Sequence, residues 1–223
     1  AMRYRHIVRQ VSVTAEDVLV DGERFDACIL ATPPYAVARM LQVDSQQDEH
    51  AALLETMQRF RYRSIATLTL QLCAQWRLPQ PLLLLEEDPA RGHVGQWVFQ
   101  RTHAEGLSQL AVVISDAEDF LKHERANFVT AIAQQIREQC AKRKTAAGQS
   151  AMPEVLNHRL IVEKRATFAA VPELTRPSTS TTWPRLFFAG DWTDTGYPAV
   201  LEGAVRSGQQ AAKELLTARN TRL

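Results

Sequence analysis

The sequence lacks several features that would place a protein directly in a functional class. It has only three cysteines, Cys28, Cys73 and Cys140, which are widely spaced and odd in number. This pattern predicts buried thiols in a reducing compartment, and neither a disulfide framework nor a metal site. The 26 basic residues nearly balance the 25 acidic ones, so the net charge of +1 gives no reason to expect nucleic acid as a partner.

Long apolar segments are also missing. The longest apolar runs, such as residues 82–85, are far shorter than the roughly 20 residues needed to span a bilayer, and the first residues lack a signal-peptide pattern. We therefore expect a cytoplasmic protein that is soluble or at most peripheral to a membrane. With 223 residues, 45% of them apolar, the chain can still bury a core in one large or two small domains.

A third absence is a glycine-rich phosphate-binding loop. Dinucleotide sites of the Rossmann type carry Gly-x-Gly-x-x-Gly between a strand and a helix, where backbone amides hold the pyrophosphate. None of the nine glycines in this chain falls in that spacing. Any dinucleotide that this chain contacts must therefore have its pyrophosphate held elsewhere.

The most informative stretch that is present runs over residues 186–208. An apolar run at 186–189 ends at Gly190-Asp191, a turn rich in threonine, aspartate and glycine follows, and Pro198 is placed to open a helix that extends to about residue 217. Glycines 203 and 208 inside this helix predict a close approach by backbone or ligand. Free amides at the helix start suit an electron-rich acceptor, and Asp191 suits a hydroxyl-bearing ligand. The alternative is an ordinary strand-helix unit.

Patterns upstream predict an α+β fold, in which a mixed or antiparallel sheet is covered by helices. Asp21-Gly22 is a hairpin signal, and Ser115-Asp-Ala-Glu118 is a capping-box pattern that predicts a helix to about residue 142. Other helices are predicted at 34–41 and 46–60. Strands are predicted at residues 5–13, 17–20, 25–31, 64–72, 82–85, 95–99, 110–115 and 155–168.

Two stretches carry a family resemblance. Phe188-Ala-Gly-Asp191, followed by Gly196-Tyr-Pro-Ala-Val-Leu-Glu-Gly-Ala-Val-Arg-Ser-Gly208, resembles the C-terminal flavin-contacting segment of the FAD-dependent amine oxidase and phytoene desaturase superfamily. Residues 21–33, ending in Ala-Thr-Pro, resemble the return from a small β-meander into the dinucleotide-binding sheet. The resemblance implies that Asp191 holds the ribityl or phosphate region of FAD and that the helix tip faces the flavin. The implied cofactor contacts are Thr32, Pro33, Gly190, Asp191, Gly196, Tyr197, Pro198, Ala199, Val200, Glu202 and Gly203.

Other stretches narrow the resemblance to the hydroxysqualene dehydroxylases of bacterial hopanoid synthesis. Gly95-Gln-Trp-Val-Phe99 and Lys164-Arg-Ala-Thr-Phe-Ala169 are similar to this subfamily, whereas Gln100, Tyr197 and Val200 depart from it. The resemblance implies that reduced FAD delivers a hydride to an allylic carbon of a long isoprenoid alcohol as its hydroxyl leaves as water. It also implies a cytoplasmic enzyme with at most peripheral contact with the inner membrane. Apolar strands at 68–85 and 97–99 fit either an isoprenoid channel or an ordinary core.

The catalytic residues stay open. The candidates for the proton donor are Tyr62, Lys164 and Arg165, and the ring of Trp97 is a candidate for stabilising a cation. A solvated or salt-bridged role is the alternative for each proton donor.

The resemblance and the missing glycine-rich loop together predict the C-terminal part of a longer enzyme. Residues 1–34 are assigned to a β-meander and a strand returning to the FAD-binding Rossmann-like domain, 35–182 to the substrate-binding domain, and 183–223 to the last strand and helix of the FAD-binding domain. We expect this chain alone to be inactive and to bind FAD weakly or not at all. The alternatives are a carotenoid-type desaturase, a flavin amine oxidase, or a non-catalytic module that binds lipid or a protein partner. Val200 disfavours an amine oxidase, because those enzymes commonly have an aromatic residue there.

Overall fold

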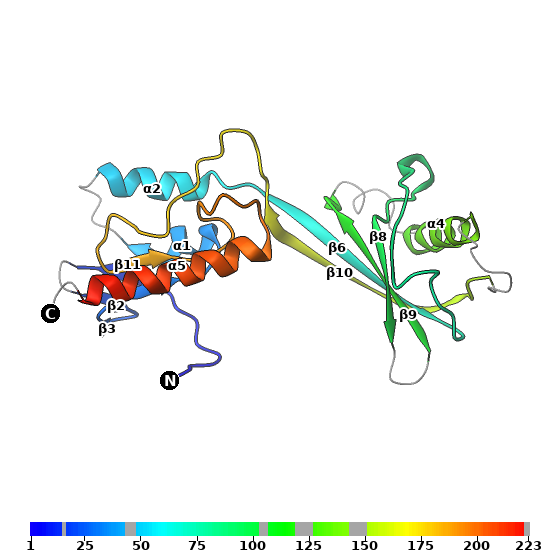
Figure 1. Ribbon diagram of the computed structural model, residues 1–223, viewed down its shortest axis with the longest axis horizontal. Helices are drawn as coiled ribbons and strands as arrows, with labels where there is room; N and C mark the ends of the chain where they lie inside the picture. The colour runs from blue at the N-terminus through cyan, green and yellow to red at the C-terminus, as the bar shows by residue number, and fades with distance from the viewer. Residues whose placement is uncertain (15–16, 43–47, 103–106, 119–126, 143–150, 221–223) are drawn as a thin grey trace. The chain divides into compact units, whose positions relative to one another are not determined.

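The computed structural model describes residues 1–14, 17–42, 48–102, 107–118, 127–142 and 151–220 (Figure 1). It divides into two compact units. The first unit consists of Ala1–Arg61 and Phe168–Leu223, and the second unit is Tyr62–Thr167. Residues 35–61 and 168–182 therefore belong to the same unit as both chain ends, whereas the sequence had assigned them to the substrate-binding domain.

The first unit begins with a small β-meander. Strands β1 (Val11–Val13), β2 (Val18–Val20) and β3 (Glu23–Phe25) pair antiparallel, and β5 (Leu41–Gln42) lies parallel to β1. Asp21 and Gly22 both have positive φ, which gives the tight hairpin turn that joins β2 to β3. The predicted hairpin is therefore confirmed, while the strand predicted at 5–13 is reduced to three residues.

A second, two-stranded sheet carries the rest of the first unit. Strand β4 (Cys28–Leu30) pairs parallel with β11 (Leu186–Phe188), and helix α5 (Leu201–Asn220) packs on β11. The run predicted as one strand at 25–31 is split, because β3 belongs to the meander and β4 to this other sheet. Helices α1 (Pro34–Met40) and α2 (Asp48–Gln58) follow β4, as predicted. The small core between β11 and α5 contains Phe187, Ala189 and Ala211.

The second unit is a five-stranded sheet in the order β10-β6-β9-β8-β7. Its strands are β6 (Tyr62–Leu72), β7 (Leu82–Leu84), β8 (Trp97–Thr102), β9 (Ser108–Ser115) and β10 (Val155–Phe168). Neighbours from β6 through β9 and β8 to β7 are antiparallel, and helix α4 (Phe128–Lys142) packs over one face of the sheet (Figure 1). A 3₁₀ turn, Pro89–Arg91, links β7 to β8. The predicted antiparallel sheet under a helix is confirmed.

The capping-box prediction at residue 115 is wrong. Ser115 is the last residue of β9 and Asp116 has positive φ, so the serine lies in a strand and not at a helix cap. Residues 119–126, where the predicted helix continues, lie outside the described residues. Glu118 is helical, so a helix does begin near the predicted place, and α4 begins at Phe128 and ends at Lys142, as predicted.

Alternation along the strands decides which side chains form the core. Leu68, Leu70 and Leu72 of β6 and Val98 of β8 face α4 and are fully buried. They pack with Ile132 and Ile136 of α4, which are also inaccessible. This arrangement follows from the period of two in a strand and the 3.6-residue period in the helix. The leucines of β6 are therefore core residues and do not line a channel.

The cysteines match the prediction only in part. They form no disulfide among the described residues, and Cys140 is buried, but Cys73, just after β6, is exposed. The prediction of a buried thiol is wrong for Cys73. Burial raises the pKa of the Cys28 thiol above its ordinary value. No helix of the described residues is both long and apolar enough to cross a membrane.

Two buried amides hold α4 against the sheet. The Gln135 side chain accepts a hydrogen bond from Gly95 N (3.0 Å) and donates to Gly95 O (2.9 Å) and Glu86 O (2.7 Å). Gln139 bonds both backbone groups of Glu86. A Cβ at position 95 would lie 2.9 Å from Gln135 Oε1, so only glycine lets the segment before β8 approach α4 this closely.

Replacing Gln135 with leucine should lower the free energy of unfolding by about 2 to 4 kcal/mol, because it leaves buried backbone groups without partners. Urea unfolding followed by tryptophan fluorescence would measure the change. The control is Gln134→Leu, at an exposed position of the same helix, which should change stability by less than about 0.5 kcal/mol. Equal effects of the two variants would contradict the role assigned to Gln135.

Candidate functional site

The two sequence motifs of the first unit meet at one edge of the β4/β11 sheet. The register pairs Cys28 with Leu186 and Leu30 with Phe188, so both strands end at the same edge. Thr32 follows β4 there, and Gly190 and Asp191 follow β11. The indole nitrogen of Trp192 donates to Thr32 O at 3.1 Å, which ties the two turns together. The carboxyl ends of parallel strands are where α/β sheets bind ligands.

Gly190 is required by the conformation of the turn. Its φ is 152°, and a Cβ there would lie 2.3 Å from the Trp192 indole nitrogen. Its amide donates to Ser207 Oγ at 2.8 Å, and that hydroxyl donates to Ala204 O at 2.7 Å. The turn after β11 is therefore fixed directly to helix α5.

Arg176 organises the loop between β11 and α5. Its guanidinium donates to the backbone carbonyls of Asp191 (2.7 Å), Trp192 (3.3 Å), Thr193 and Tyr197 (2.5 Å). The same group lies over the Phe168 ring, 5.3 Å from its centroid. Four carbonyls from one loop thus converge on a single cation, which fixes the loop backbone.

Sequence reasoning missed Arg176. It lies in a passage rich in proline, serine and threonine, where an arginine before a proline carries no pattern of its own. The one available signal was indirect: a loop of irregular backbone leaves carbonyls that need donors.

The Asp191 carboxyl is half-buried and the Thr32 hydroxyl is buried. Burial raises the pKa of the Asp191 carboxyl above its ordinary value, although the nearby Arg176 opposes the shift. Thr32 Oγ1 is buried and hydrogen-bonds to no described residue. A buried hydroxyl without a partner is costly, so this edge can accept a polar group from a ligand.

The predicted start of the last helix needs correction. Helix α5 begins at Leu201, three residues after Pro198, because Val200 N is turned back to Pro198 O (2.8 Å) and Val200 O accepts the first helical bond, from Ala204 N. The amides of the first turn are then those of residues 201–203, and not those of Ala199 and Val200, which a helix opened by Pro198 would present. The helix tip still points to open space, since Leu201 is 87% exposed.

The side chains of the first turn support the loop. Glu202 accepts from Arg206 Nε at 2.7 Å, and the Arg206 guanidinium lies over the Tyr197 ring, 4.8 Å from its centroid. A Cβ on Gly203 would lie 3.2 Å from Thr195 Oγ1, so the close approach predicted at this glycine is made by the loop itself. Gly208 differs, because no described atom lies within 4 Å of the Cβ position.

A pocket of about 320 Å³ opens beside this loop. Its lining includes Phe168, Leu174, Arg176, Tyr197 and Pro198. The pocket reaches the loop at Gly196–Pro198, and neither the Gly190-Asp191 turn nor the first turn of α5 belongs to its lining.

The second unit presents an apolar face opposite α4. Leu82 pairs with Phe99 across β7 and β8, and Leu84 pairs with Trp97. These four side chains are between 37% and 55% exposed, whereas Val98, between Trp97 and Phe99, is fully buried. Two aromatic and two aliphatic side chains thus form a continuous patch, which we call the outer apolar face.

The four catalytic candidates do not meet at one place in the second unit. Tyr62 on β6 and Arg165 on β10 are brought together, with the guanidinium carbon 6.0 Å from the ring centroid. Lys164 is exposed on β10, while Trp97 lies on β8, with β6 and β9 between them. The proton-donor candidates Tyr62, Lys164 and Arg165 lie on β6 and β10, apart from the outer apolar face on β7 and β8.

Comparison with known proteins identifies the family. A model of the family described as flavin containing amine oxidoreductase matches residues 1–216. The chain belongs to this family. Proteins of this family contain flavin, as the description of the family states, and the flavin-contacting role of residues 188–208 stays a prediction.

The relatives are longer than this chain. It is 34% identical over 234 residues to hydroxysqualene dehydroxylase of Sinorhizobium fredii, covering 99% of this chain and 48% of the relative. It is 33% identical over 205 residues to hydroxysqualene dehydroxylase of Rhodopseudomonas palustris, covering 91% and 41%. The predicted similarity to this subfamily is thus confirmed. The chain spans about half the length of the curated relatives it matches.

A solved structure supports the fold. An oxidoreductase from Methanosarcina mazei superposes with a TM-score of 0.62 at 15% identity, covering 92% of this chain and 48% of that one. At this identity the likeness establishes the amine-oxidase-like fold alone.

The predicted cofactor contacts lie together in the first unit. They include the buried Thr32 hydroxyl, the half-buried Asp191 carboxyl and the exposed tip of α5. Pro33, Gly196, Pro198 and Ala199 belong to the same two turns. Nothing in the described residues supplies a glycine-rich pyrophosphate loop.

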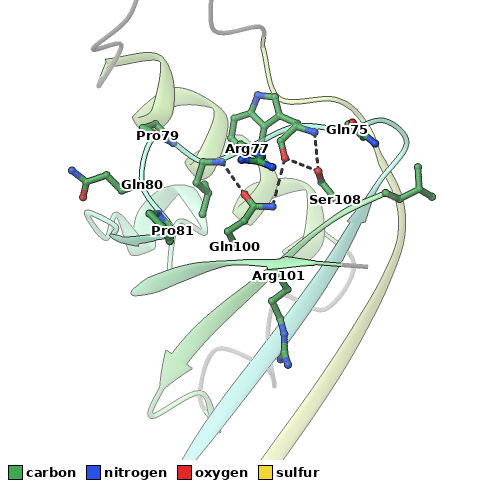
Figure 2. Close-up of a pocket in the computed structure, with 11 residues that line it drawn as sticks. Gln75, Arg77, Pro79, Gln80, Pro81, Gln100, Arg101 and Ser108 are labelled. Carbon is green, nitrogen blue, oxygen red and sulfur yellow. Dashed lines mark hydrogen bonds between the residues drawn. The ribbon is translucent and has the colours of Figure 1, made fainter. Parts of the chain in front are cut away.

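A larger pocket in the second unit has a structural explanation. It measures about 650 Å³ and is lined by residues 75–81 with parts of β8 and β9 (Figure 2). Gln100 Oε1 accepts from Leu78 N (2.9 Å), and Ser108 Oγ accepts from Trp76 N (2.8 Å) and donates to Trp76 O (2.5 Å). Arg101 points away from these groups (Figure 2). Gln100, the departure from the subfamily, therefore holds a loop.

Replacing Arg176 with methionine should loosen the loop of residues 191–197 without unfolding the first unit. The loss of four charge-assisted hydrogen bonds should speed amide exchange in this loop at least 10-fold, which corresponds to about 1.4 kcal/mol. Hydrogen-exchange mass spectrometry would measure it, with Arg39→Met on an exposed position of α1 as the control. Unchanged exchange in the loop would refute the anchoring role.

Proposed function

We propose that this chain is the substrate-binding and C-terminal flavin-contacting part of an FAD-dependent oxidoreductase that acts on a long isoprenoid. The reaction is the reductive dehydroxylation of hydroxysqualene to squalene. The observation that carries the proposal is the 34% identity to hydroxysqualene dehydroxylase over 99% of the chain. The outer apolar face adds physical support, because exposed aromatic and aliphatic side chains suit a hydrocarbon and not a charged amine.

The reaction needs a hydride, a proton and a dry site. Reduced FAD, when bound in the full-length enzyme, would supply the hydride that replaces the hydroxyl at the allylic carbon, and the hydroxyl would take a proton and leave as water. The outer apolar face holds the hydrocarbon by excluding water from Leu82, Trp97 and Phe99. The aromatic rings also favour a developing positive charge on the allylic carbon.

The first unit is proposed to hold the flavin from one side. Arg176 fixes the loop, and the fixed loop presents the Asp191 carboxyl and the first-turn amides of α5. Thr32 offers a buried hydroxyl from the neighbouring turn. This arrangement predicts that a substitution of Asp191 weakens FAD retention more than a substitution of its neighbours in the loop.

In the full-length enzyme, Asp191→Asn should weaken FAD binding at least 10-fold, because the amide cannot accept hydrogen bonds as a carboxylate does. Fluorescence titration of apoenzyme with FAD would measure the change. The matched control is Asp194→Asn, an exposed carboxylate three residues further along the same loop, which should leave the affinity unchanged. If both variants bind FAD like the parent, Asp191 has no role in the cofactor site.

The substrate class is tested with reduced, FAD-loaded full-length enzyme offered hydroxysqualene, phytoene and a simple amine. Squalene formed from the first substrate alone is the expected result. Leu82→Lys should reduce kcat/KM for hydroxysqualene at least 10-fold, because a charge is placed on the apolar face. Ile7→Lys, which changes an exposed aliphatic residue of the first unit, is the control. Turnover of phytoene or the amine in place of hydroxysqualene would refute the assignment.

A further inference from the structure

Three polar side chains lie in register across the sheet of the second unit. Arg101 of β8 lies opposite Gln109 of β9, and Gln109 lies opposite Gln71 of β6. Residues that are directly opposite in an antiparallel pair project from the same face of the sheet. The three side chains therefore form one line across three strands, which we call the polar row.

The polar row belongs to the same face as the outer apolar face. Trp97, Phe99 and Arg101 are spaced by two residues along β8, so their side chains share one side of the sheet. Val98 and Gln100, which alternate with them, face the other side, where Val98 is fully buried. Figure 2 shows Arg101 directed away from Gln100, across the strand. A ligand on the outer apolar face can therefore reach Arg101.

The face changes from apolar to polar in a single step along the strands. The two rows before the polar row are apolar on β7, β8 and β9 and carry a threonine on β6. They consist of Leu84, Trp97, Val113 and Thr67, and of Leu82, Phe99, Ala111 and Thr69. A hydrocarbon chain that follows β8 over these two rows thus ends at the polar row.

The polar row offers hydrogen-bond donors and a positive charge. Arg101 is exposed, whereas Gln71 and Gln109 are half-buried. The guanidinium forms no ion pair with any residue that the structure describes. Each carboxamide adds an NH₂ group, and none of the three side chains is an acid. The row can therefore bind an anion without displacing a carboxylate from Arg101.

The length of the polar row indicates the kind of head group. Neighbouring strands lie about 4.8 Å apart, so the row spans roughly 10 Å from β8 to β6. A single hydroxyl can use only one or two of these donors. A phosphate ester carries several acceptor oxygens, which guanidinium and amide groups can bind together. The polar row therefore suits a phosphate better than a hydroxyl.

We propose that the second unit binds an isoprenoid phosphate, with the hydrocarbon tail on the outer apolar face and the phosphate on the polar row. The proposal rests on the proposed function in one respect, which is that the outer apolar face holds an isoprenoid chain. It adds an anionic ligand class to the neutral alcohol. Because the tail occupies the same face, this ligand competes with the alcohol.

The test compares farnesyl phosphate, farnesol and inorganic phosphate by isothermal titration calorimetry. The protein is the full-length, FAD-loaded enzyme in its oxidised form, and each amphiphile is kept below its critical micelle concentration. Farnesyl phosphate should bind at least 10-fold more tightly than farnesol, because only the phosphate uses the polar row. Inorganic phosphate should bind at least 100-fold more weakly than farnesyl phosphate, since it has no tail. High salt should reduce the preference for the phosphate.

Variants separate the head group site from the tail site. Arg101→Met should lower the affinity for farnesyl phosphate at least 10-fold and leave the affinity for farnesol within twofold. Gln109→Leu, in the middle of the row, should lower the affinity for farnesyl phosphate at least threefold. The matched control is Arg77→Met, which removes the same charge from the loop on the other side of β8 (Figure 2) and should change neither affinity. Circular dichroism checks that the variants fold.

Equal affinities for farnesyl phosphate and farnesol would overturn the inference, as would an Arg101→Met enzyme that keeps the preference for the phosphate. If farnesyl phosphate binds as expected but hydroxysqualene yields no squalene, the phosphate site stands and the proposed reaction fails. If squalene forms and farnesyl phosphate does not inhibit its formation, the proposed reaction stands and the phosphate site fails. The two failures are therefore distinguishable.

Discussion

The parallel pairing of β4 with β11 is the constraint on which the candidate site depends. Three residue pairs, from Cys28–Leu186 to Leu30–Phe188, bring together two turns that are about 160 residues apart in the chain. Because parallel strands end at the same edge, Thr32 and Gly190-Asp191 must emerge side by side. The Trp192–Thr32 hydrogen bond then fixes the spacing that the register allows. A shift of one residue would turn Phe187 out of its core and separate the turns.

The loop after β11 is held by hydrogen bonds to a cation as well as by the buried Trp192 ring, which packs against Phe60 and Phe188. Arg176 donates hydrogen bonds to four carbonyls that have no partner in a strand or helix. The Phe168 ring packs against one side of the guanidinium. Gly190 and Gly203 let Trp192 and Thr195 come close enough to complete the arrangement. The loop backbone is thus set before any ligand arrives, which lowers the entropic cost of binding.

The sequence predicted the elements whose signals are local. The Asp21-Gly22 hairpin, strand β10 with its bounds, and the Gly190-Asp191 turn all follow from turn chemistry or alternation within a few residues. The start of α5 was placed wrongly because Pro198 is compatible with a first helical turn, whereas the turn of Val200 N back to Pro198 O is a tertiary outcome. Arg176 was missed for the same reason, because its partners lie 15 to 21 residues away.

The two faces of the second unit show what a strand pattern leaves undecided. Leu68, Leu70 and Leu72 are as apolar as Leu82 and Leu84, yet the first three are core and the last two are exposed. The difference arises from α4, which covers one face, with Gln135 and Gln139 binding the backbone at Glu86 and Gly95. These buried amides fix the helix on that face, so the opposite face keeps Trp97 and Phe99 at its surface. Exposed aromatic side chains cost free energy in water at about 25 cal/mol per Å². The outer apolar face is therefore the part of the second unit that is free to bury apolar surface, and it is the part that the proposed function assigns to the hydrocarbon.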